Sequence, residues 1–286
     1  MLSKGIKHML IAGVFFSFMN LGVKYLKHIP SIEIVFFRAL VTLIISFIMI
    51  KRANMSLMGK NKPILFLRGL FGVIALSMYF YTLQAMPFGS AVTIQQLSPI
   101  FATIIAVFIL KEKVLKPQWL FFLISFAGVA LIKGFDTRVS LPLLLLSLGA
   151  AFFSALAYNM VRKLKDTDHP LVVVFYFPLI ALPVAGIFSA MNWVMPQGWD
   201  WLILLGIGIA TQIAQVQMTK ALQMESIANV SIVRYLTVIY ALGFGFFLFK
   251  EKYNWLTIVG ILLVVAGVVF NILYKKHLKT QAKRLE

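Results

Sequence analysis

The sequence predicts an all-α polytopic membrane protein whose ten transmembrane helices form two inverted five-helix repeats. Hydrophobic residues make up 61% of the 286 residues and charged residues only 13%, against about 25% charged residues in soluble proteins. The apolar residues lie in long uninterrupted runs, and the second half of the chain repeats the first at a constant offset. Runs of this length need lipid as solvent, and a backbone in lipid satisfies its own hydrogen bonds by forming helices.

Each element is justified by an apolar run near the roughly 20 residues that a membrane-spanning helix requires. The turn Met86-Pro87-Phe88-Gly89 separates the third run from the fourth, because proline and glycine favour a turn there. The predicted spans are Ile6–Val23, Ile32–Ile50, Ile64–Ala85, Ser90–Leu110, Gln118–Ile132, Leu141–Val161, Leu171–Met191, Trp201–Leu222, Ile227–Phe249 and Trp255–Tyr274.

The internal repeat has an offset of 139 residues, as from Glu112 to Glu251. Since each half contains an odd number of spans, the second half must insert upside down relative to the first, as in many secondary transporters. We expect the repeats to occupy residues 1–139 and 140–278, followed by a basic cytoplasmic tail at 279–286. The segments that recur are Lys111-Glu112-Lys113 as Lys250-Glu251-Lys252, Leu83-Gln84 as Leu222-Gln223, and Ala127-Gly128-Val129 as Ala266-Gly267-Val268.

The net charge of +18 is interpreted as membrane topology, not as nucleic-acid binding. The basic residues cluster between apolar runs, and no nucleic-acid-binding motif occurs. With the N-terminus inside, the cytoplasmic segments hold 17 Lys and Arg residues and the outer loops hold 6. This bias predicts a multi-pass protein of the cell (inner) membrane with both termini cytoplasmic. We expect a monomer or homodimer.

Enzyme classes are excluded by the residues that the spans lack. The chain has no cysteine, and its four histidines and four aspartates fall in loops or tails. An intramembrane hydrolase or metalloenzyme needs such residues clustered within the spans, and a nucleotide-driven pump needs a P-loop, which is absent. We therefore predict no catalytic site, no metal and no cofactor. A midspan carboxylate is also absent, which leaves proton coupling, exchange and facilitated flux open.

The segment Leu83-Gln84-Ala85-Met86 leads into Ala91 and Pro99, and the stretch from Arg68 to Gly72 precedes it. With the duplication, this order resembles the drug/metabolite transporter superfamily and its EamA-type ten-helix carriers. The resemblance covers nearly the whole chain and implies transport of small metabolites. It also implies a central cavity lined by the first, third, fourth, sixth, eighth and ninth spans, with the fifth and tenth at the periphery.

Two polar stripes are candidates for lining this cavity. Thr211, Gln215 and Thr219 follow the spacing of one helical face. Gln95 and Gln96 precede a midspan proline, which removes a helical hydrogen bond and frees a carbonyl. The alternative is that these side chains bond neighbouring helices together. The repeat-related Asn20 and Asn159 are expected first to make such cross-helix bonds and second to line the cavity.

Basic side chains inside the spans are expected to be functional or to reach water at a helix end. Arg234 and Lys220 are kept as substrate contacts. Arg68 is expected to extend its charge to water, and Arg38 to have a structural role because its helix is not expected to line the cavity. Guanidinium groups left unpaired in the cavity would favour an anionic or zwitterionic substrate.

The predicted function is a secondary transporter that moves a small polar metabolite by alternating access. The metabolite is an amino acid, another zwitterion or a nucleoside-like cofactor such as S-adenosylmethionine. Alternatives are a membrane scaffold or enzyme subunit with a transporter fold, and a flippase for lipid-linked substrates. Glu112 and Glu251 are expected to bond the amides that open the next helix. The predicted substrate-binding residues are Asn20, Tyr79, Gln84, Gln95, Gln96, Ser98, Tyr158, Asn159, Thr211, Gln212, Gln215, Lys220, Arg234 and Tyr235.

Overall fold

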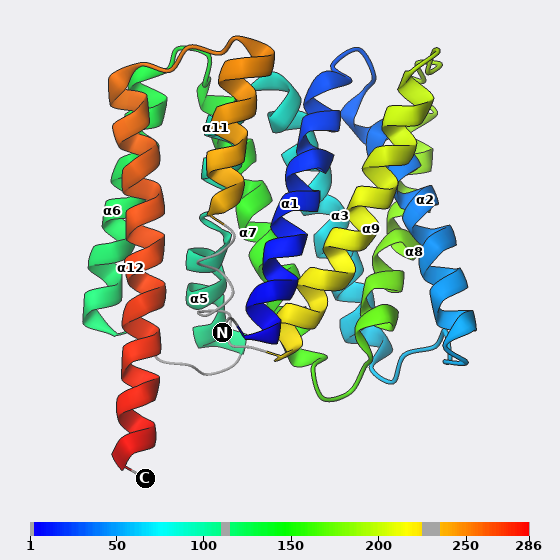
Figure 1. Ribbon diagram of the computed structural model, residues 1–286, viewed down its shortest axis with the longest axis horizontal. Coiled ribbons are helices and arrows are strands. Elements are labelled where there is room, and N and C mark those ends of the chain that lie inside the picture. Colours follow the sequence, from blue (N-terminus) through cyan, green and yellow to red (C-terminus); the bar gives the residue numbers. More distant parts are fainter. Residues whose placement is uncertain (1–2, 110–114, 225–234, 286) are drawn as a thin grey trace.

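The structure, a computed structural model, describes residues 3–109, 115–224 and 235–285, and side chains as far as residue 274. Every regular element in these ranges is an α-helix, as the sequence predicts (Figure 1). The helices are α1 (Lys4–Tyr25), α2 (Ser31–Arg52), α3 (Lys62–Ala85), α4 (Phe88–Gln95), α5 (Ser98–Ile109), α6 (Lys116–Phe135), α7 (Leu141–Lys163), α8 (Pro170–Ser189), α9 (Asp200–Met224), α11 (Leu236–Phe249) and α12 (Trp255–Leu285).

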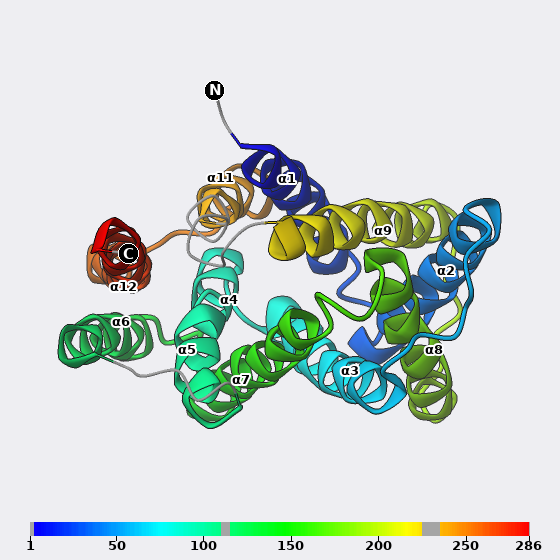
Figure 2. The ribbon, with the colours of Figure 1, turned by 90° about the horizontal axis from the view of Figure 1, so that it is seen from below.

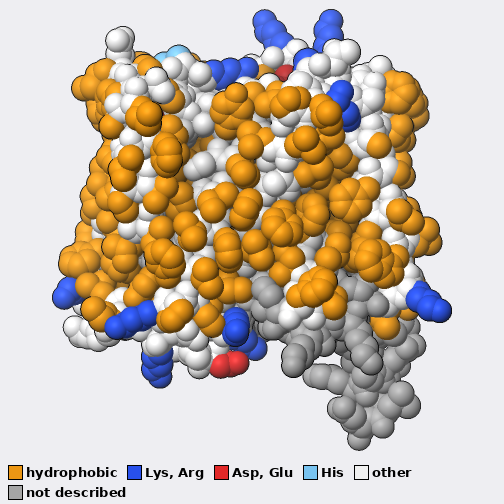
Figure 3. Space-filling view, turned by 180° about the vertical axis from the view of Figure 1, so that it is seen from behind, with side chains coloured by type: hydrophobic (Ala, Val, Ile, Leu, Met, Phe, Trp, Pro, Cys, Tyr) orange, Lys and Arg blue, Asp and Glu red, His pale blue; other side chains and the backbone are white. Residues whose placement is uncertain are grey.

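The surface of these helices is that of a membrane protein. In the described ranges, nine spans are long and apolar enough to cross a bilayer, with Phe88–Phe108 counted as one, and α11 is a shorter apolar helix. Figure 3 shows a broad hydrophobic band with Lys and Arg side chains at its two edges. Large hydrophobic side chains such as Phe108, Leu123 and Leu262 are exposed, which lipid accommodates and water does not. The prediction of a multi-pass membrane protein is confirmed.

The duplication is visible in the helix bounds. Shifted by 139 residues, the bounds of α1, α2, α3 and α5 fall within two residues of those of α7, α8, α9 and α11. The helix α6 likewise matches the start of α12, which continues to Leu285. The predicted span Trp255–Tyr274 agrees with the apolar part of α12, whereas α6 is longer by two and three residues than the predicted span Gln118–Ile132.

The second repeat is inverted relative to the first. The loop that follows α6 is bonded to the hairpin that precedes α12, since Arg138 Nη2 donates to the Lys252 carbonyl over 2.8 Å. The helix α6 thus ends where α12 begins, although the two occupy equivalent places in their repeats. They pack side by side in opposite directions, at the edge of the molecule (Figure 2). A parallel duplication would start both helices at the same end.

The remaining helices pack in pairs across the two repeats. The helix α1 lies on α9, α3 on α7 and α2 on α8, while the short α4 is buried and α5 lies against α7 (Figure 2). We name the two ends of the molecule by one acidic residue each. The Glu251 end carries the loops 26–30, 86–87, 136–140 and 250–254, and the Asp168 end carries the loops 53–61 and 164–169.

The predicted span Ser90–Leu110 is wrong in one respect, because it consists of two helices. The helix α4 stops at Gln95, and α5 starts at Ser98. Pro99 explains the interruption: it has no N–H to donate, and its ring would clash with the carbonyl of Gln95 in a continuous helix. In the first turn of α5 the same proline fits without loss. The break lies in the middle of the membrane span.

Candidate substrate-binding site

A central cavity of about 130 Å³ lies where the two repeats meet. Both repeats contribute to it, and the peripheral helices α6 and α12 do not. The lining residues are Met9, Gly13, Phe16, Met19, Asn20, Arg38, Arg68, Gly72, Ala75, Leu76, Tyr79, Val92, Gln95, Gln96, Ser154, Ala157, Tyr158, Val161, Phe177, Gln215, Met218 and Thr237.

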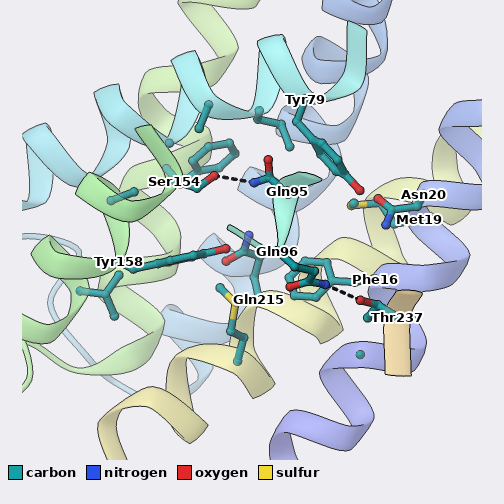
Figure 4. Close-up of a pocket in the computed structure, with 18 of the residues that line it drawn as sticks. Phe16, Met19, Asn20, Tyr79, Gln95, Gln96, Ser154, Tyr158, Gln215 and Thr237 are labelled. Carbon is teal, nitrogen blue, oxygen red and sulfur yellow. Dashed lines mark hydrogen bonds between the residues drawn. The ribbon is translucent and has the colours of Figure 1, made fainter. Parts of the chain in front are cut away.

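Two glutamines at the helix break are the most central polar groups. Gln95 Nε2 donates to Ser154 Oγ over 2.8 Å, and Gln96 Nε2 donates to Thr237 Oγ1 over 2.7 Å (Figure 4). Each bond links the first repeat to the second. The interruption of the helix places these neighbouring side chains against different partners, whereas neighbours on a regular helix point away from each other.

Tyrosine and asparagine complete the polar wall. Tyr79 from α3 and Tyr158 from α7 extend into the cavity from different helices, and Asn20 from α1 lies near Tyr79 (Figure 4). Asn20 is 5% exposed, and its Oδ1 has no hydrogen-bond partner among the described residues. The side chains offer both donors and acceptors to a polar ligand.

Two arginines also line the cavity, and both contact the Phe177 ring. The Arg38 guanidinium carbon lies 4.8 Å from the ring centroid, and that of Arg68 lies 5.2 Å from it. Arg38 Nε donates to Thr211 Oγ1 over 3.0 Å. Arg68 Nη2 makes a longer bond of 3.4 Å to Gln215 Oε1.

The expectation for Arg68 is wrong, and so is the premise of the expectation for Arg38, although the Arg38–Thr211 bond is a structural contact. Arg68 does not extend to water at a helix end, because only 4% of it is exposed. Arg38 is not remote from the cavity, since α2 lines it at this residue and α8 at Phe177. The resemblance placed neither helix at the cavity. Glu33, the acidic residue nearest to Arg38 along the chain, does not pair with it but accepts the Val194 N–H over 3.0 Å.

Six of the predicted substrate-binding residues line the cavity in this conformation. They come from α1, α3, α7, α9 and the α4–α5 break, in agreement with five of the six spans that the resemblance implied. Their role as substrate contacts stays a prediction. The six are Asn20, Tyr79, Gln95, Gln96, Tyr158 and Gln215.

Three other predicted residues make contacts between helices. Thr211 accepts from Arg38, and Gln212 exchanges hydrogen bonds of 2.9 and 3.1 Å with Ser46. Asn159 Nδ2 donates to the Ala102 carbonyl of α5 over 3.2 Å. The cross-helix bond expected first for Asn159 is thus present, whereas its repeat equivalent Asn20 faces the cavity.

The remaining predicted residues do not line the cavity in this conformation. Gln84 Nε2 donates to the carbonyls of Leu26 and Ile29 over 2.8 and 3.1 Å, in the loop after α1. Ser98 and Tyr235 are buried at the starts of α5 and α11, and Lys220 is partly exposed on α9. Arg234 lies outside the described residues.

Sequence reasoning did not select four cavity residues that now stand out. Ser154 and Thr237 bond the two glutamines, and Gly72 gives Phe177 room beside the arginines, since a Cβ there would lie 2.8 Å from the ring. A lone serine or threonine in an apolar run carries no signal of its own. Phe177 is one of 26 phenylalanines, so only its contacts distinguish it.

An ion pair between the repeats lies at the Glu251 end of the molecule. The Glu251 carboxylate accepts the Phe88 N–H at 2.8 Å and lies 3.4 Å from Lys24 Nζ, which also donates to the Met86 carbonyl. Tyr253 donates to Glu251 over 2.5 Å and accepts the Gly89 N–H over 3.0 Å. Lys24 is 2% exposed.

This geometry corrects the expectation for Glu251. It does not bond an amide of the next helix, α12, but the amide that opens α4 in the other repeat. Burial raises the pKa of the Tyr253 phenol well above its usual value, and the bond to Glu251 acts in the same direction. The phenol therefore stays protonated as a donor to the carboxylate. Glu112, the repeat equivalent of Glu251, lies outside the described residues.

The described residues contain no group of three or more His, Asp or Glu side chains that could hold a metal ion. The cavity residues are amides, hydroxyls, two guanidinium groups and apolar side chains. Such a set can bind a polar or anionic molecule through hydrogen bonds and charge.

Comparisons with known proteins agree with this arrangement. A family model described as the EamA-like transporter family matches residues 3–134 and 141–273. A solved crystal structure of another protein is 16% identical, with a TM-score of 0.71 over 97% of this chain and 99% of that one, which shows a common fold.

Three curated relatives are transporters. The pseudopaline exporter of Pseudomonas aeruginosa is 29% identical, covering 95% of this chain and 97% of that protein. The riboflavin transporter of Vibrio cholerae is 30% identical over 76% of each chain. The S-adenosylmethionine uptake transporter of Rickettsia prowazekii is 23% identical, covering 95% and 93%. The family and these names are those of small-molecule transporters and not of enzymes. The chain belongs to the EamA-like transporter family.

Proposed function

We propose that the chain is a secondary transporter that moves a small polar metabolite across the cell (inner) membrane by alternating access. One observation carries the proposal: a polar cavity lies between two inverted repeats, and an ion pair links those repeats at the Glu251 end. We infer that this pair closes the cavity at that end. Exchange of conformations between inverted repeats opens the opposite end of such a cavity. The substrate class proposed is an amino acid, another zwitterion or a nucleoside-like cofactor.

The parts of the molecule are assigned as follows. Residues 1–139 and 140–278 are the two units that rock against each other, and residues 279–286 form a basic cytoplasmic tail. The bias of Lys and Arg toward the loops of the Asp168 end supports a cytoplasmic position for that end and for both termini. The protein acts as a monomer or homodimer, with small molecules and lipid as its partners and no nucleic acid.

Transport in proteoliposomes tests this function. We expect uptake of an amino acid, of riboflavin or of S-adenosylmethionine to saturate with concentration and to be stimulated by the same compound inside the vesicle. Counterflow of this kind requires a carrier whose site faces one side at a time. Flux proportional to the gradient, without saturation or counterflow, overturns the proposal.

The proposed contacts are tested by removing one polar group at a time. Gln215→Ala and Arg234→Ala should reduce transport while the folded protein is retained. Gln118→Ala is the matched control, because Gln118 is a buried glutamine that bonds Asn271 over 2.8 Å in the α6–α12 pair, away from the cavity. Wild-type transport in both site variants contradicts the assignment of these two residues.

A flippase for lipid-linked substrates is a second candidate with one observation in its favour. A groove of about 740 Å³ lies between α1, α9 and α11, and most of its lining is apolar. The groove and the cavity share no lining residue. A lipid-linked substrate with its head group in the cavity therefore could not place its tail directly in the groove in this conformation. A lipid-linked substrate that the reconstituted protein flips faster than empty vesicles do would favour this function.

A further inference from the structure

We propose that the transported metabolite carries a net negative charge, and that its carboxylate or phosphate oxygens bind Arg68 and Arg38. This inference rests on the proposed transporter and narrows the substrate class of the same cavity to anions, which excludes neutral zwitterions and the cationic S-adenosylmethionine. The surrounding amides and hydroxyls bind the uncharged part of the molecule.

The two guanidinium groups have N–H donors that no acceptor in the described residues binds. Arg68 Nε and Nη1 have no hydrogen-bond partner among the described residues, and neither has Arg38 Nη1. Arg68 is 4% exposed and Arg38 is 1% exposed, and both line the cavity. A buried charged donor without an acceptor is strongly destabilising, so such groups are retained where a ligand supplies the acceptor.

The acidic side chains of the described residues all lie away from the cavity. No acidic residue in the described ranges lines the cavity. Glu33 and Glu251 bond backbone amides near the Glu251 end, where Asp136 pairs with Arg138. The others lie in loops or at a helix end: Asp168 accepts the Lys60 N–H, Asp200 pairs with His28, and Asp166 is in the loop after α7. Two positive charges therefore face the cavity without a protein counter-ion in the described part of the chain.

The Phe177 ring already stabilises these charges in part. Both guanidinium groups lie within cation–π distance of it, at 4.8 Å for Arg38 and 5.2 Å for Arg68. Gly72 allows the ring this position, because a Cβ at residue 72 would lie 2.8 Å from the ring. A ring face attracts a cation without neutralising it, so the positive potential of the cavity remains. An anion entering this potential is favoured, and a cation of similar size is repelled.

The geometry of the ligand follows from guanidinium chemistry. A planar guanidinium forms paired hydrogen bonds with carboxylate and phosphate groups. Two such groups beside one ring fit a molecule with two anionic oxygens or groups better than a zwitterion, whose own ammonium would meet the same positive field. Asn20 and Gln95 carry acceptors without a described partner, and these suit hydroxyl or amide donors on the rest of the metabolite.

The test measures ligand-induced changes in melting temperature on the purified full chain. The probes are succinate and citrate as polycarboxylates, glycerol 3-phosphate as a phosphate ester and glutamine as a zwitterion. We expect at least one of the anions, and not glutamine, to raise the melting temperature of the wild type. The probe that acts distinguishes a carboxylate from a phosphate ligand.

Variants then assign the effect to the cavity. Arg68→Gln should weaken the apparent affinity for the active anion about 10- to 100-fold, the range of a charge-assisted hydrogen bond. Arg52→Gln, the same change at an exposed position at the end of α2, should leave it unchanged. Arg68→Lys keeps the charge and is the variant to use if Arg68→Gln does not fold. Its affinity for the anion should lie between that of the wild type and that expected for Arg68→Gln.

Two results overturn the inference. One is that no anion stabilises the protein, or that glutamine does so as strongly; the other is that Arg68→Gln binds the anion as well as the wild type. Saturable counterflow of a neutral or zwitterionic compound, unchanged in Arg68→Gln, removes the anion inference but leaves the transporter intact. Absence of saturable flux for every compound that binds removes the proposed function and leaves the binding site.

Discussion

Replacing Glu251 by glutamine should open the cavity at the Glu251 end. The variant keeps the size of the side chain and an oxygen that can accept the Phe88 N–H. It loses the negative charge that lies 3.4 Å from Lys24 Nζ. Lys24 is 2% exposed and contacts no other acidic group in the described ranges. In the variant its ammonium would therefore remain buried without a counter-ion.

The size of the effect follows from this burial. Removing one partner of a buried ion pair costs about 3–5 kcal/mol. We take the lower figure, because the Met86 carbonyl still accepts from Lys24. If this cost of about 3 kcal/mol falls on the sealed conformation alone, the ratio of open to sealed molecules rises about 100-fold, at roughly 1.4 kcal/mol for each factor of ten.

The assay is the rate of labelling of a single cysteine. The chain contains no cysteine, so Val92→Cys introduces the only thiol, in the cavity wall on α4. A membrane-impermeant maleimide is applied to vesicles of either orientation. Glu251→Gln should raise labelling from the Glu251 end by about two orders of magnitude and lower it from the Asp168 end.

Two controls separate the ion pair from general destabilisation. Asp200→Asn removes an acidic group at the same end, but its partner His28 is 55% exposed in its side chain, and exposed pairs contribute little. Lys24→Met combined with Glu251→Gln removes both charges and should restore slow labelling. If Glu251→Gln lowers the melting temperature and leaves labelling unchanged, Glu251 stabilises the fold and does not seal the cavity.

Three further predictions concern glycines and the Asp168 end. Gly128→Val should lower the melting temperature by several degrees, because a Cβ would lie 2.5 Å from the Gly260 carbonyl, while transport persists since this helix pair is peripheral. Gly72→Ala should displace Phe177 and weaken substrate binding several-fold in a direct binding assay, with little change in melting temperature. The Asp168 carboxylate accepts the Lys60 N–H over 2.6 Å in the loop before α3. Asp168→Asn should therefore lower the free energy of local opening of this loop by about 1–2 kcal/mol, and hydrogen exchange of its amides should become faster.

The fold could be predicted because its signals are distributed along the whole chain. Ten apolar runs and one offset of 139 residues determine the number of spans and the inversion. Even the repeated Ala-Gly-Val motif has a physical basis in the structure. Gly128 lies against the Gly260 backbone, and Gly267 lies against the Phe121 carbonyl, so the motif marks the close α6–α12 crossing. A substituent at either glycine would separate the two helices.

The site was less predictable, because a polar residue in a span serves equally well as a helix contact or as a ligand contact. Thr211 and Gln215 share one helical face, yet Thr211 accepts from Arg38 while Gln215 lines the cavity. Which of these occurs depends on neighbours far away in the sequence. Arg38 shows the same difficulty, because its helix reaches the cavity only through the length of its side chain.

The interruption between α4 and α5 limits how the transport cycle can proceed. Exposed backbone groups are not tolerated in lipid, and a broken helix persists at that depth only inside protein or beside water. The residues at this break, Gln95 and Gln96, must therefore stay shielded from the acyl chains in inward-facing, occluded and outward-facing states alike. In the proposed alternating-access cycle we therefore expect smaller displacements of this segment than of the helices around it.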